Sequence, residues 1–194
     1  MRSVTSTPTL HLTVGLPGVG KTTLARELER ETGALRLTPD EWMAPLFGLQ
    51  WADFGDKRDV LEGRLIWVGH QVLRAGMSVV LDFGCWSPEE RWALRAIAGN
   101  AGAGFELHYL ALAEDERRRR STARRLRSPG DTFEMTDEDH QRFSALFTPP
   151  TAAELDGRSL PRPPEPFESW PAWAAHRWPT LPRLDDAAGT RARP

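Results

Sequence analysis

The chain has 194 residues, which is enough for one domain with a full hydrophobic core. Its composition, with 40% hydrophobic and 27% charged residues and a formal net charge of -2, is that of an ordinary soluble protein and gives no general argument for binding to nucleic acid or membrane. The single cysteine excludes an internal disulfide and a cysteine-rich zinc site. Residues 1–9, predicted as a flexible N-terminus, lack the apolar stretch of a signal peptide, so we expect a cytoplasmic location.

The first predicted element is a strand at residues 10–14, and a helical pattern follows from residue 21. Between them, GLPGVGKT fits G-x-x-x-x-G-K-[ST], the P-loop pattern. Backbone N–H groups of such a loop surround phosphate oxygens, its lysine reaches the β- and γ-phosphates, and its hydroxyl binds Mg²⁺. An ordinary glycine-rich turn would account for the glycines but not for the Lys-Thr pair. We therefore predict nucleotide binding by Gly15, Pro17, Gly18, Val19, Gly20, Lys21, Thr22 and Thr23.

Three further strands are predicted at residues 34–37, 78–83 and 105–112, and they alternate with helical patterns. This alternation is typical of βα units and predicts a doubly wound α/β fold. The expected architecture is the three-layer sandwich of P-loop NTPases, with a parallel sheet of four to five strands and helices on both faces. Capping residues predict helix starts at SPEE, residues 87–90, and at TDED, residues 136–139.

Two aspartates follow predicted strands, on the side of the sheet where the P-loop lies. Asp82 ends the run SVVLD, where a P-loop protein places a carboxylate close to Mg²⁺, although a strand-end aspartate can instead cap a turn. Asp40, in LRLTPDEW, is a candidate catalytic carboxylate on the far side of the γ-phosphate. The alternative for Asp40 is an acidic residue in the first turn of a helix, and one side chain can serve both purposes.

An arginine-rich helical segment covers residues 114–127. Arg117, Arg120 and Arg124 recur at helical spacing, so one face would present three guanidinium groups. We predict that this segment closes as a lid over the triphosphate and stabilises charge on the transferring phosphoryl group. The alternative is a solvated helix face, which is the common meaning of a charge run.

The final segment, residues 149–194, differs in composition from the predicted P-loop domain at residues 10–148. It is rich in proline, yet it contains Trp170, Trp173 and Trp178, which a disordered tail seldom contains. We predict an extended tail that packs on the domain, with both ends of the chain frayed.

Four segments, taken in order, resemble the AAA-type P-loop kinases that include the zeta toxins, chloramphenicol phosphotransferase and polynucleotide 5′-hydroxyl kinases: GLPGVGKTTLARELE, LTPDEW, VVLDFGCWSPEERWALRAIA and ERRRRSTARR. The resemblance covers roughly residues 10–154. It implies that Lys21 and Thr22 hold ATP and Mg²⁺ and take part in transfer. It also implies that Asp40 activates the acceptor hydroxyl and that Asp82 supports the metal.

The same resemblance makes Arg120 and Arg124 lid residues and places Arg91 near the acceptor, although an exposed helix arginine is an equal alternative for Arg91. Where relatives often carry D-x-T-N, this chain has DFGCW, so Trp86 replaces a small polar residue near the acceptor. Aromatic residues after Asp40 form either a stacking wall for a planar or glycosidic acceptor or a small satellite core: Trp42, Phe47, Trp51 and Phe54.

The predicted activity is transfer of the γ-phosphate of ATP, with GTP as the other candidate and Mg²⁺ as cofactor, to a hydroxyl of a small molecule. Nucleoside-like, sugar and antibiotic-like acceptors are open. One alternative is a polynucleotide 5′-hydroxyl kinase, which the balanced charge and the short basic stripe make less favoured. Another is a nucleotide-dependent switch without an acceptor. Transfer is expected to be direct and in line, without a phospho-enzyme.

Overall fold

The computed structural model describes residues 7–48, 54–127, 135–157 and 160–184. Its helices and strands follow in chain order: β1 (Thr9–Val14), α1 (Lys21–Thr32), β2 (Leu35–Leu37), α2 (Pro39–Phe47), α3 (Phe54–Arg74), β3 (Val79–Gly84), α4 (Pro88–Asn100), β4 (Gly104–Tyr109), α5 (Glu114–Arg127), α6 (Asp137–Leu146), α7 (Ala152–Leu155) and α8 (Trp170–Arg177). The predicted helix starts agree with these bounds, and the predicted strands agree to within one residue, except that β4 ends at Tyr109 and not at residue 112. None of the described helices is both long and apolar enough to cross a lipid bilayer.

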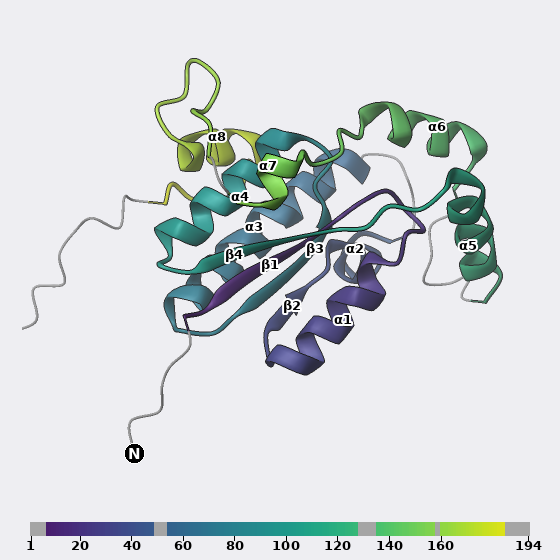
Figure 1. Ribbon diagram of the computed structural model, residues 1–194, viewed down its shortest axis with the longest axis horizontal. Coiled ribbons are helices and arrows are strands. Elements are labelled where there is room, and N and C mark those ends of the chain that lie inside the picture. Colours follow the sequence, from purple (N-terminus) through teal and green to yellow (C-terminus); the bar gives the residue numbers. More distant parts are fainter. Residues whose placement is uncertain (1–6, 49–53, 128–134, 158–159, 185–194) are drawn as a thin grey trace, which may run out of the picture.

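The four strands form one parallel sheet in the order β2-β3-β1-β4 (Figure 1). In the register of the sheet, Leu10 of β1 lies beside Val79 of β3 and Phe105 of β4. From β1 the chain passes to β2 on one side, and from β3 it crosses to β4 on the other. In an open α/β sheet, ligands bind outside the carboxyl ends of the strands at such a change of direction. The loop after β1 and the end of β3 therefore meet at the expected binding edge.

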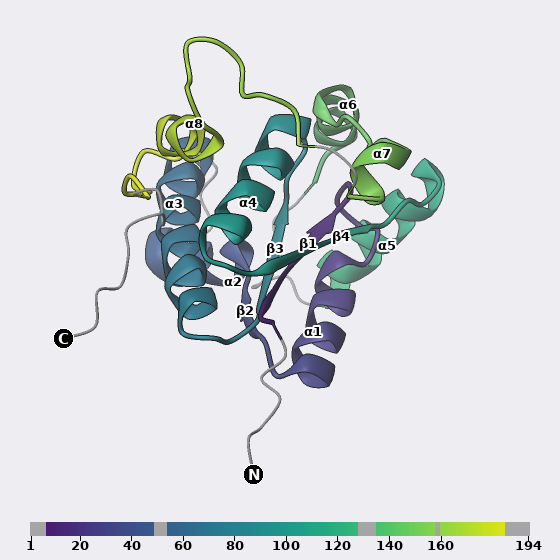
Figure 2. The same cartoon turned by 60° about the vertical axis from the view of Figure 1, so that its left-hand side comes forward.

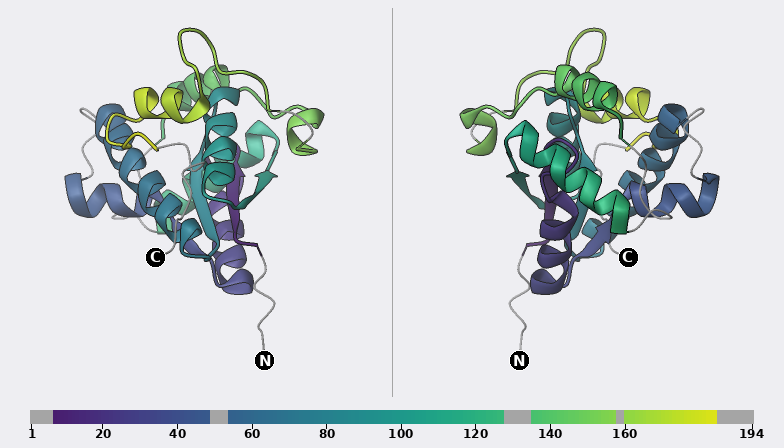
Figure 3. Two further views of the ribbon diagram at one scale, coloured as in Figure 1. Left: turned by 90° about the vertical axis from the view of Figure 1, so that its left-hand side faces the viewer. Right: turned by 90° about the vertical axis from the view of Figure 1, so that its right-hand side faces the viewer.

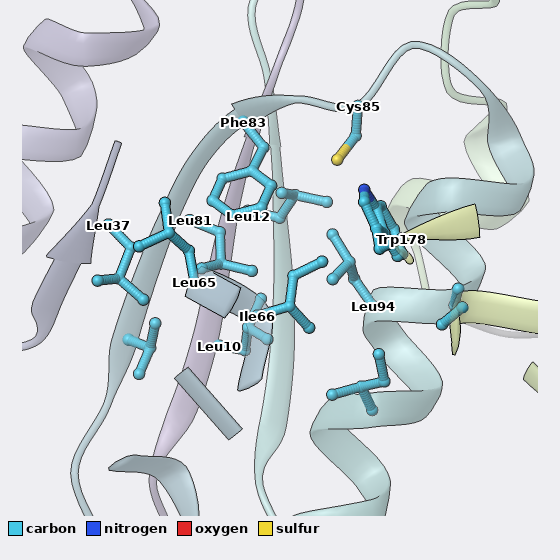
Figure 4. Packing of buried hydrophobic residues seen from close by; sticks show 14 of the residues in the cluster. Leu10, Leu12, Leu37, Leu65, Ile66, Leu81, Phe83, Cys85, Leu94 and Trp178 are labelled. Atoms are coloured by element: carbon cyan, nitrogen blue, oxygen red, sulfur yellow. The ribbon is translucent and has the colours of Figure 1, made fainter. Parts of the chain in front are cut away.

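Helices cover both faces of the sheet, with α1 on one face and α3 and α4 on the other (Figure 2). Successive strand residues point to opposite faces. Leu12 and Leu81 accordingly join the larger core below α3 and α4, together with Leu94 (Figure 4). Val80 instead packs with Ala25 of α1. Asp82, two residues after Val80, thus lies on the face that carries α1 and the P-loop.

The predicted helix starts at residues 87 and 136 are confirmed in detail. Ser87 Oγ accepts a hydrogen bond from Glu90 N at 3.2 Å, and the Glu90 carboxylate accepts one from Ser87 N at 3.3 Å. Thr136 and Asp139 form the same reciprocal pair at the start of α6. Each capping box satisfies backbone donors that a helix end leaves open, which sets where α4 and α6 begin.

The proline- and tryptophan-rich segment contains helices, where an extended tail was expected. α8 lies against α4 and beside α3 (Figure 3), and both Trp170 and Trp178 are buried. Trp178 is fully buried and donates its Nε1 hydrogen to Glu62 of α3 at 3.0 Å. Replacing such a core tryptophan by alanine typically costs about 3–5 kcal/mol, so α8 is part of the core rather than an accessory. The predicted frayed ends lie mostly outside the described residues.

Candidate active site

The P-loop backbone has the conformation that a phosphate cradle requires. Gly15, Gly18 and Gly20 have φ values of 147°, 88° and 104°, which glycine adopts readily. A Cβ atom at Gly15 would come within 2.4 Å of the Leu110 carbonyl oxygen, and one at Gly18 within 2.6 Å of that of Arg117. The loop is therefore pressed between the end of β4 and the start of α5. Only glycine fits at these two close approaches.

Helix α1 begins directly at Lys21, with Gly20 as its N-cap. No side chain caps this helix start and its first turn carries no acidic residue, so the N-terminal N–H groups and the positive end of the helix dipole face the cleft. Lys21 Nζ donates to the Leu16 carbonyl oxygen at 3.1 Å, across the loop. Its ammonium group is thereby held over the cradle.

Asp82 joins the P-loop to the sheet through two hydroxyl groups. Thr22 Oγ1 donates to Asp82 Oδ2 at 2.7 Å, and Thr13 Oγ1 donates to Asp82 Oδ1 at 2.8 Å. Asp82 is 5% exposed, and both it and Thr22 line the cleft. Hydroxyl and carboxylate oxygens are the ligands that Mg²⁺ prefers, so this pair fits the predicted metal position.

One cleft of about 1890 Å³ is lined by P-loop residues together with residues of α2, α3, α4 and α8, among others. Its nucleotide side is lined by Pro17, Gly18, Gly20, Lys21, Thr22, Thr23 and Asp82. Gly15 and Val19 are buried beneath the loop and do not line it. The cleft is also lined by a second group of residues, here called the acceptor side after the prediction for Asp40: Asp40, Arg58, Asp59, Glu62, Trp86, Ser87, Glu90 and Arg177.

Asp40 stands in the first turn of α2 and is held by an arginine from α3. The Arg58 guanidinium contacts the Asp40 carboxylate, donates to Glu62 at 2.8 Å, and donates to the Phe83 carbonyl oxygen at 3.2 Å. The last contact is at the end of β3, one residue beyond Asp82. Because the two carboxylates outweigh its burial, the pKa of Arg58 is raised above its usual range. Arg58 therefore ties Asp40 to the strand end that carries Asp82.

Glu62 is the buried member of this group. Burial raises its pKa to about 7, since the loss of hydration outweighs the attraction of Arg58, and the nearby Glu90 adds to the shift. Both of its oxygens accept hydrogen bonds, one from Arg58 and the other from Trp178. Glu62 thus connects the acceptor side to the C-terminal helix.

Helix α8 contributes a side chain to the cleft. Arg177 donates to Glu90 Oε1 at 2.8 and 3.0 Å and pairs with Asp59 at 2.7 Å. It therefore bridges α4 and α3 where both line the acceptor side. Sequence reasoning missed Arg58, Glu62, Glu90 and Arg177 as site residues. The spacing of Arg58 and Glu62, four apart on one helix, was a usable signal, but Arg177 had none.

The arginines of α5 do not share one environment. Arg120 lines the cleft and pairs with Glu116 at 2.8 Å. Arg117 is 3% exposed and turns away from the cleft to donate to Ser144 of α6 at 3.2 Å. The side chain of Arg124 lies outside the described residues. α5 and α6 sit together beyond the carboxyl ends of the strands (Figure 1), so Arg117 joins the two helices while Arg120 faces the ligand space.

Two tryptophans predicted near the acceptor, Trp86 and Trp42, lie in different places. Trp86 lines the cleft, and its ring lies 4.7 Å from that of Phe143 in α6. Trp42 is 47% exposed and is not part of the cleft wall. Neither Trp51 nor the Phe54 side chain lies within the described residues. A complete aromatic wall is therefore not visible in the described part of the chain.

Arg91 requires a correction, because it is neither an exposed helix residue nor a cleft residue. It is 1% exposed and forms a two-point ion pair with Glu154, with Nη2 to Oε2 at 3.1 Å. Its Nη1 donates to the carbonyl oxygens of Thr148, Cys85 and Trp86 at 3.0, 3.3 and 3.4 Å. Arg91 thus fixes the loop after β3 to the segment after α6. Helical spacing could not reveal a partner 63 residues away.

Comparison of the sequence with models of protein families gives a match that includes the P-loop. A model of the AAA domain matches residues 10–150. The chain belongs to the AAA domain family. The match spans β1 to the residues just before α7, so it includes the P-loop, Asp40, Asp82 and the α5–α6 pair. Comparison with curated proteins gives no match.

Solved structures share the P-loop NTPase fold at low identity. Chaetomium thermophilum Kti12 in complex with ADP-AlF3 is 18% identical, with a TM-score of 0.58, covering 93% of this chain and 100% of that chain. A gluconokinase from Sinorhizobium meliloti is 17% identical, with a TM-score of 0.55 and coverages of 75% and 78%. A chain of the Pnkp1/Rnl/Hen1 RNA repair complex is 18% identical, with a TM-score of 0.55 and coverages of 72% and 43%.

Proposed function

We propose that the protein is an ATP-dependent kinase that transfers the γ-phosphate to a hydroxyl group of a small molecule. The observation that carries the proposal is that one cleft is lined by Lys21, Thr22 and Asp82 and also by Asp40. A phosphoryl-transfer enzyme needs these two walls to face each other across the γ-phosphate. The solved structures of a gluconokinase and of Kti12 share the fold in which this cleft lies.

The nucleotide side is suited to ATP and Mg²⁺. At Gly15 and Gly18 the loop passes so close to neighbouring backbone that only glycine fits, and the loop backbone forms a cradle for phosphate. The uncapped start of α1 faces the same space. Thr22 and Asp82 would hold Mg²⁺, which, when bound, neutralises charge on the phosphates. Lys21 adds a positive charge beside the β- and γ-phosphates.

The acceptor side supplies the proton acceptor. In our proposal the acceptor hydroxyl lies between the Asp40 carboxylate and the γ-phosphorus. Its proton passes to Asp40 as its oxygen bonds to phosphorus, and the bond from phosphorus to the bridging oxygen of ADP breaks. Arg58 orients Asp40 without leaving its own contacts with Glu62 and Phe83. Arg120 of α5 would face the charge that develops on the transferred group.

A small acceptor is favoured over a polynucleotide by the charge of the acceptor side. Four carboxylates of this group line the cleft: Asp40, Asp59, Glu62 and Glu90. Its two arginines, Arg58 and Arg177, are paired with all four of them. A polyanionic strand would meet this wall with unfavourable electrostatics. A neutral or cationic polyhydroxylated molecule would meet hydrogen-bond acceptors instead.

The test is a transfer screen with γ-labelled ATP and Mg²⁺ against nucleosides, sugars, aminoglycosides, other hydroxylated antibiotics and 5′-hydroxyl oligonucleotides. Asp40→Asn should lower kcat about 10²- to 10⁴-fold for the accepted class while the affinity for ATP stays within about twofold. Asp56→Asn is the matched control, since Asp56 is exposed in α3 and does not line the cleft.

The outcomes separate three functions. Transfer to a small hydroxylated molecule, lost in Asp40→Asn and kept in Asp56→Asn, supports the proposal. Transfer to oligonucleotides alone, with a steep dependence on salt, would replace it by polynucleotide 5′-hydroxyl kinase. ATP binding and hydrolysis that Asp40→Asn leaves unchanged would favour a nucleotide-dependent switch.

A further inference from the structure

A second cluster of chemically active side chains lies away from the cleft, on the β4 edge of the sheet. It consists of His11 in β1 and Glu106 and His108 in β4. His11 is directly beside Glu106 in the parallel register, and Thr13 is beside His108. Phe105 and Leu107 pack into the core below α3 and α4, so Glu106 and His108 point to the other face. None of the three lines the ATP cleft.

The three ligand atoms converge on one point. His11 Nδ1 lies 3.1 Å from Glu106 Oε2 and 3.2 Å from His108 Nε2, and His108 Nε2 lies 3.7 Å from Glu106 Oε2. Metal bonds of about 2.0–2.1 Å at tetrahedral angles place neighbouring ligand atoms about 3.3–3.4 Å apart. The three measured separations lie on either side of this value.

We propose that His11, Glu106 and His108 bind one divalent transition-metal ion of the Zn²⁺ class. Two imidazole nitrogens and one carboxylate oxygen suit Zn²⁺, Co²⁺, Ni²⁺ or Cu²⁺, whereas Mg²⁺ and Ca²⁺ prefer oxygen ligands alone. The ligands come from two neighbouring strands, so little rearrangement is needed. His11 is 6% exposed, while the Glu106 side chain is 59% exposed, which leaves a solvent-facing position for a water ligand.

The simpler alternative is that the three side chains only form hydrogen bonds with one another, but hydrogen bonds alone do not satisfy all three ligand atoms. Each imidazole nitrogen here is either a donor or an acceptor, and His11 Nδ1 lies within hydrogen-bonding distance of both a nitrogen and a carboxylate oxygen. A single proton on His11 Nδ1 serves only one of these contacts well. A cation at the centre would satisfy one lone pair from each side chain.

The bound ion would act as a cross-strand link beneath the P-loop. β1 ends at Val14, whose carbonyl oxygen accepts from Leu110 N at 2.9 Å, and the Leu110 carbonyl oxygen packs against Gly15. Joining β1 to β4 therefore stabilises the two segments between which the P-loop is held. Any ligand that binds the folded chain more tightly than the unfolded chain raises the melting temperature.

The test is a Zn²⁺ titration of the full chain after treatment with a chelator, by calorimetry and thermal unfolding, with excess Mg²⁺ present to occupy oxygen-only sites. We expect one equivalent to bind and to raise Tm. His108→Gln and Glu106→Gln should each weaken Zn²⁺ binding by more than about tenfold. Both side chains are partly exposed, so neither change should prevent folding. Co²⁺ bound in place of Zn²⁺ should show the intense visible absorption of a four-coordinate site.

His176→Gln is the matched control, because His176 is an exposed histidine of α8 whose ring contacts Phe167. It should leave Zn²⁺ affinity unchanged. The proposal is overturned if the chain binds no Zn²⁺ saturably, or if His108→Gln and Glu106→Gln bind it as tightly as the parent chain. The readouts need no enzyme activity, so their result is independent of the kinase proposal.

Discussion

The two sides of the cleft are built in different ways. The nucleotide side comes from one continuous loop, the start of α1 and a single strand-end carboxylate, and backbone geometry does much of the positioning. The acceptor side is assembled from α2, α3, α4 and α8, and paired side chains do the positioning. A backbone cradle tolerates many side-chain changes around it, whereas a network of paired charges depends on every member. We infer that the acceptor side is where this chain can differ most from proteins of the same fold.

The strongest test of the nucleotide side is Lys21→Ala. Loss of its charge beside the γ-phosphate should lower kcat about 100-fold or more, with an unchanged circular dichroism spectrum. The chain has one other lysine, Lys57, which lies 6.0 Å from the Phe47 ring and outside the cleft wall. Lys57→Ala is therefore the matched control and should retain activity. Equal kinetics for the two variants would remove the P-loop from the mechanism.

On the acceptor side, Arg58→Met should lower kcat up to about 100-fold, because Asp40 loses the contact that positions it. The dissociation constant for ATP should change little, since Arg58 contacts Asp40, Glu62 and Phe83 in the acceptor-side group. Arg58→Lys should recover only part of the activity, because one ammonium group cannot contact Asp40, Glu62 and Phe83 together. Arg64→Met, on the exposed side of α3, is the control. A parallel loss of ATP affinity would contradict the separation of the two sides.

The substitution Arg177→Met tests whether α8 contributes to acceptor binding as well as to packing. Freed from Arg177, Glu90 and Asp59 should reorient, and the KM for the acceptor identified in the screen should rise about tenfold while the KM for ATP stays constant. Arg183→Met is the control, since Arg183 is exposed and does not line the cleft. If both variants behave like the parent chain, α8 supports the fold only.

The smallest expected effect is on stability and concerns Glu62→Gln. The Glu62 pKa is about 7 in the folded protein and 4.5 in its reference state, so the folded chain holds an extra proton between these pH values. This contribution to stability is present below about pH 4.5 and is lost as the pH rises through 7. Between pH 5 and 8, the free energy of unfolding of Glu62→Gln, measured by urea unfolding, should fall less with rising pH than that of the parent chain. Glu138→Gln, at an exposed position, should keep the pH dependence of the parent chain.

Much of the fold could be predicted from local sequence patterns. The P-loop, the four strands and the capping boxes at Ser87 and Thr136 each depend on residues close together in the chain, and the structure bears out all of them. The contact between Thr22 and Asp82 also follows from the pattern, because a carboxylate after β3 and a hydroxyl at the start of α1 must meet at one edge of the sheet.

Local sequence patterns did not predict the directions of several side chains. Arg117 and Arg120 share a helix and similar spacing, yet one is buried against Ser144 and the other lines the cleft. Arg91 is buried with Glu154 rather than placed beside the acceptor. The tail forms α8 because Trp170 and Trp178 have a hydrophobic surface to cover, which the sequence of the tail does not reveal.

The sequence by itself therefore determined the α/β architecture, the P-loop and the positions of Asp40 and Asp82 at or just after strand ends, because strand periodicity, glycine conformations and helix caps act over a few residues. Only the tertiary structure decided that Arg58 and Arg177 surround the acceptor side, that Arg91 is structural, and that His11 meets Glu106 and His108. The pairs Arg58–Asp40, Arg91–Glu154, Arg177–Glu90 and His11–His108 lie 18 to 97 residues apart. Packing of the helices and the register of the sheet, not local pattern, bring them together.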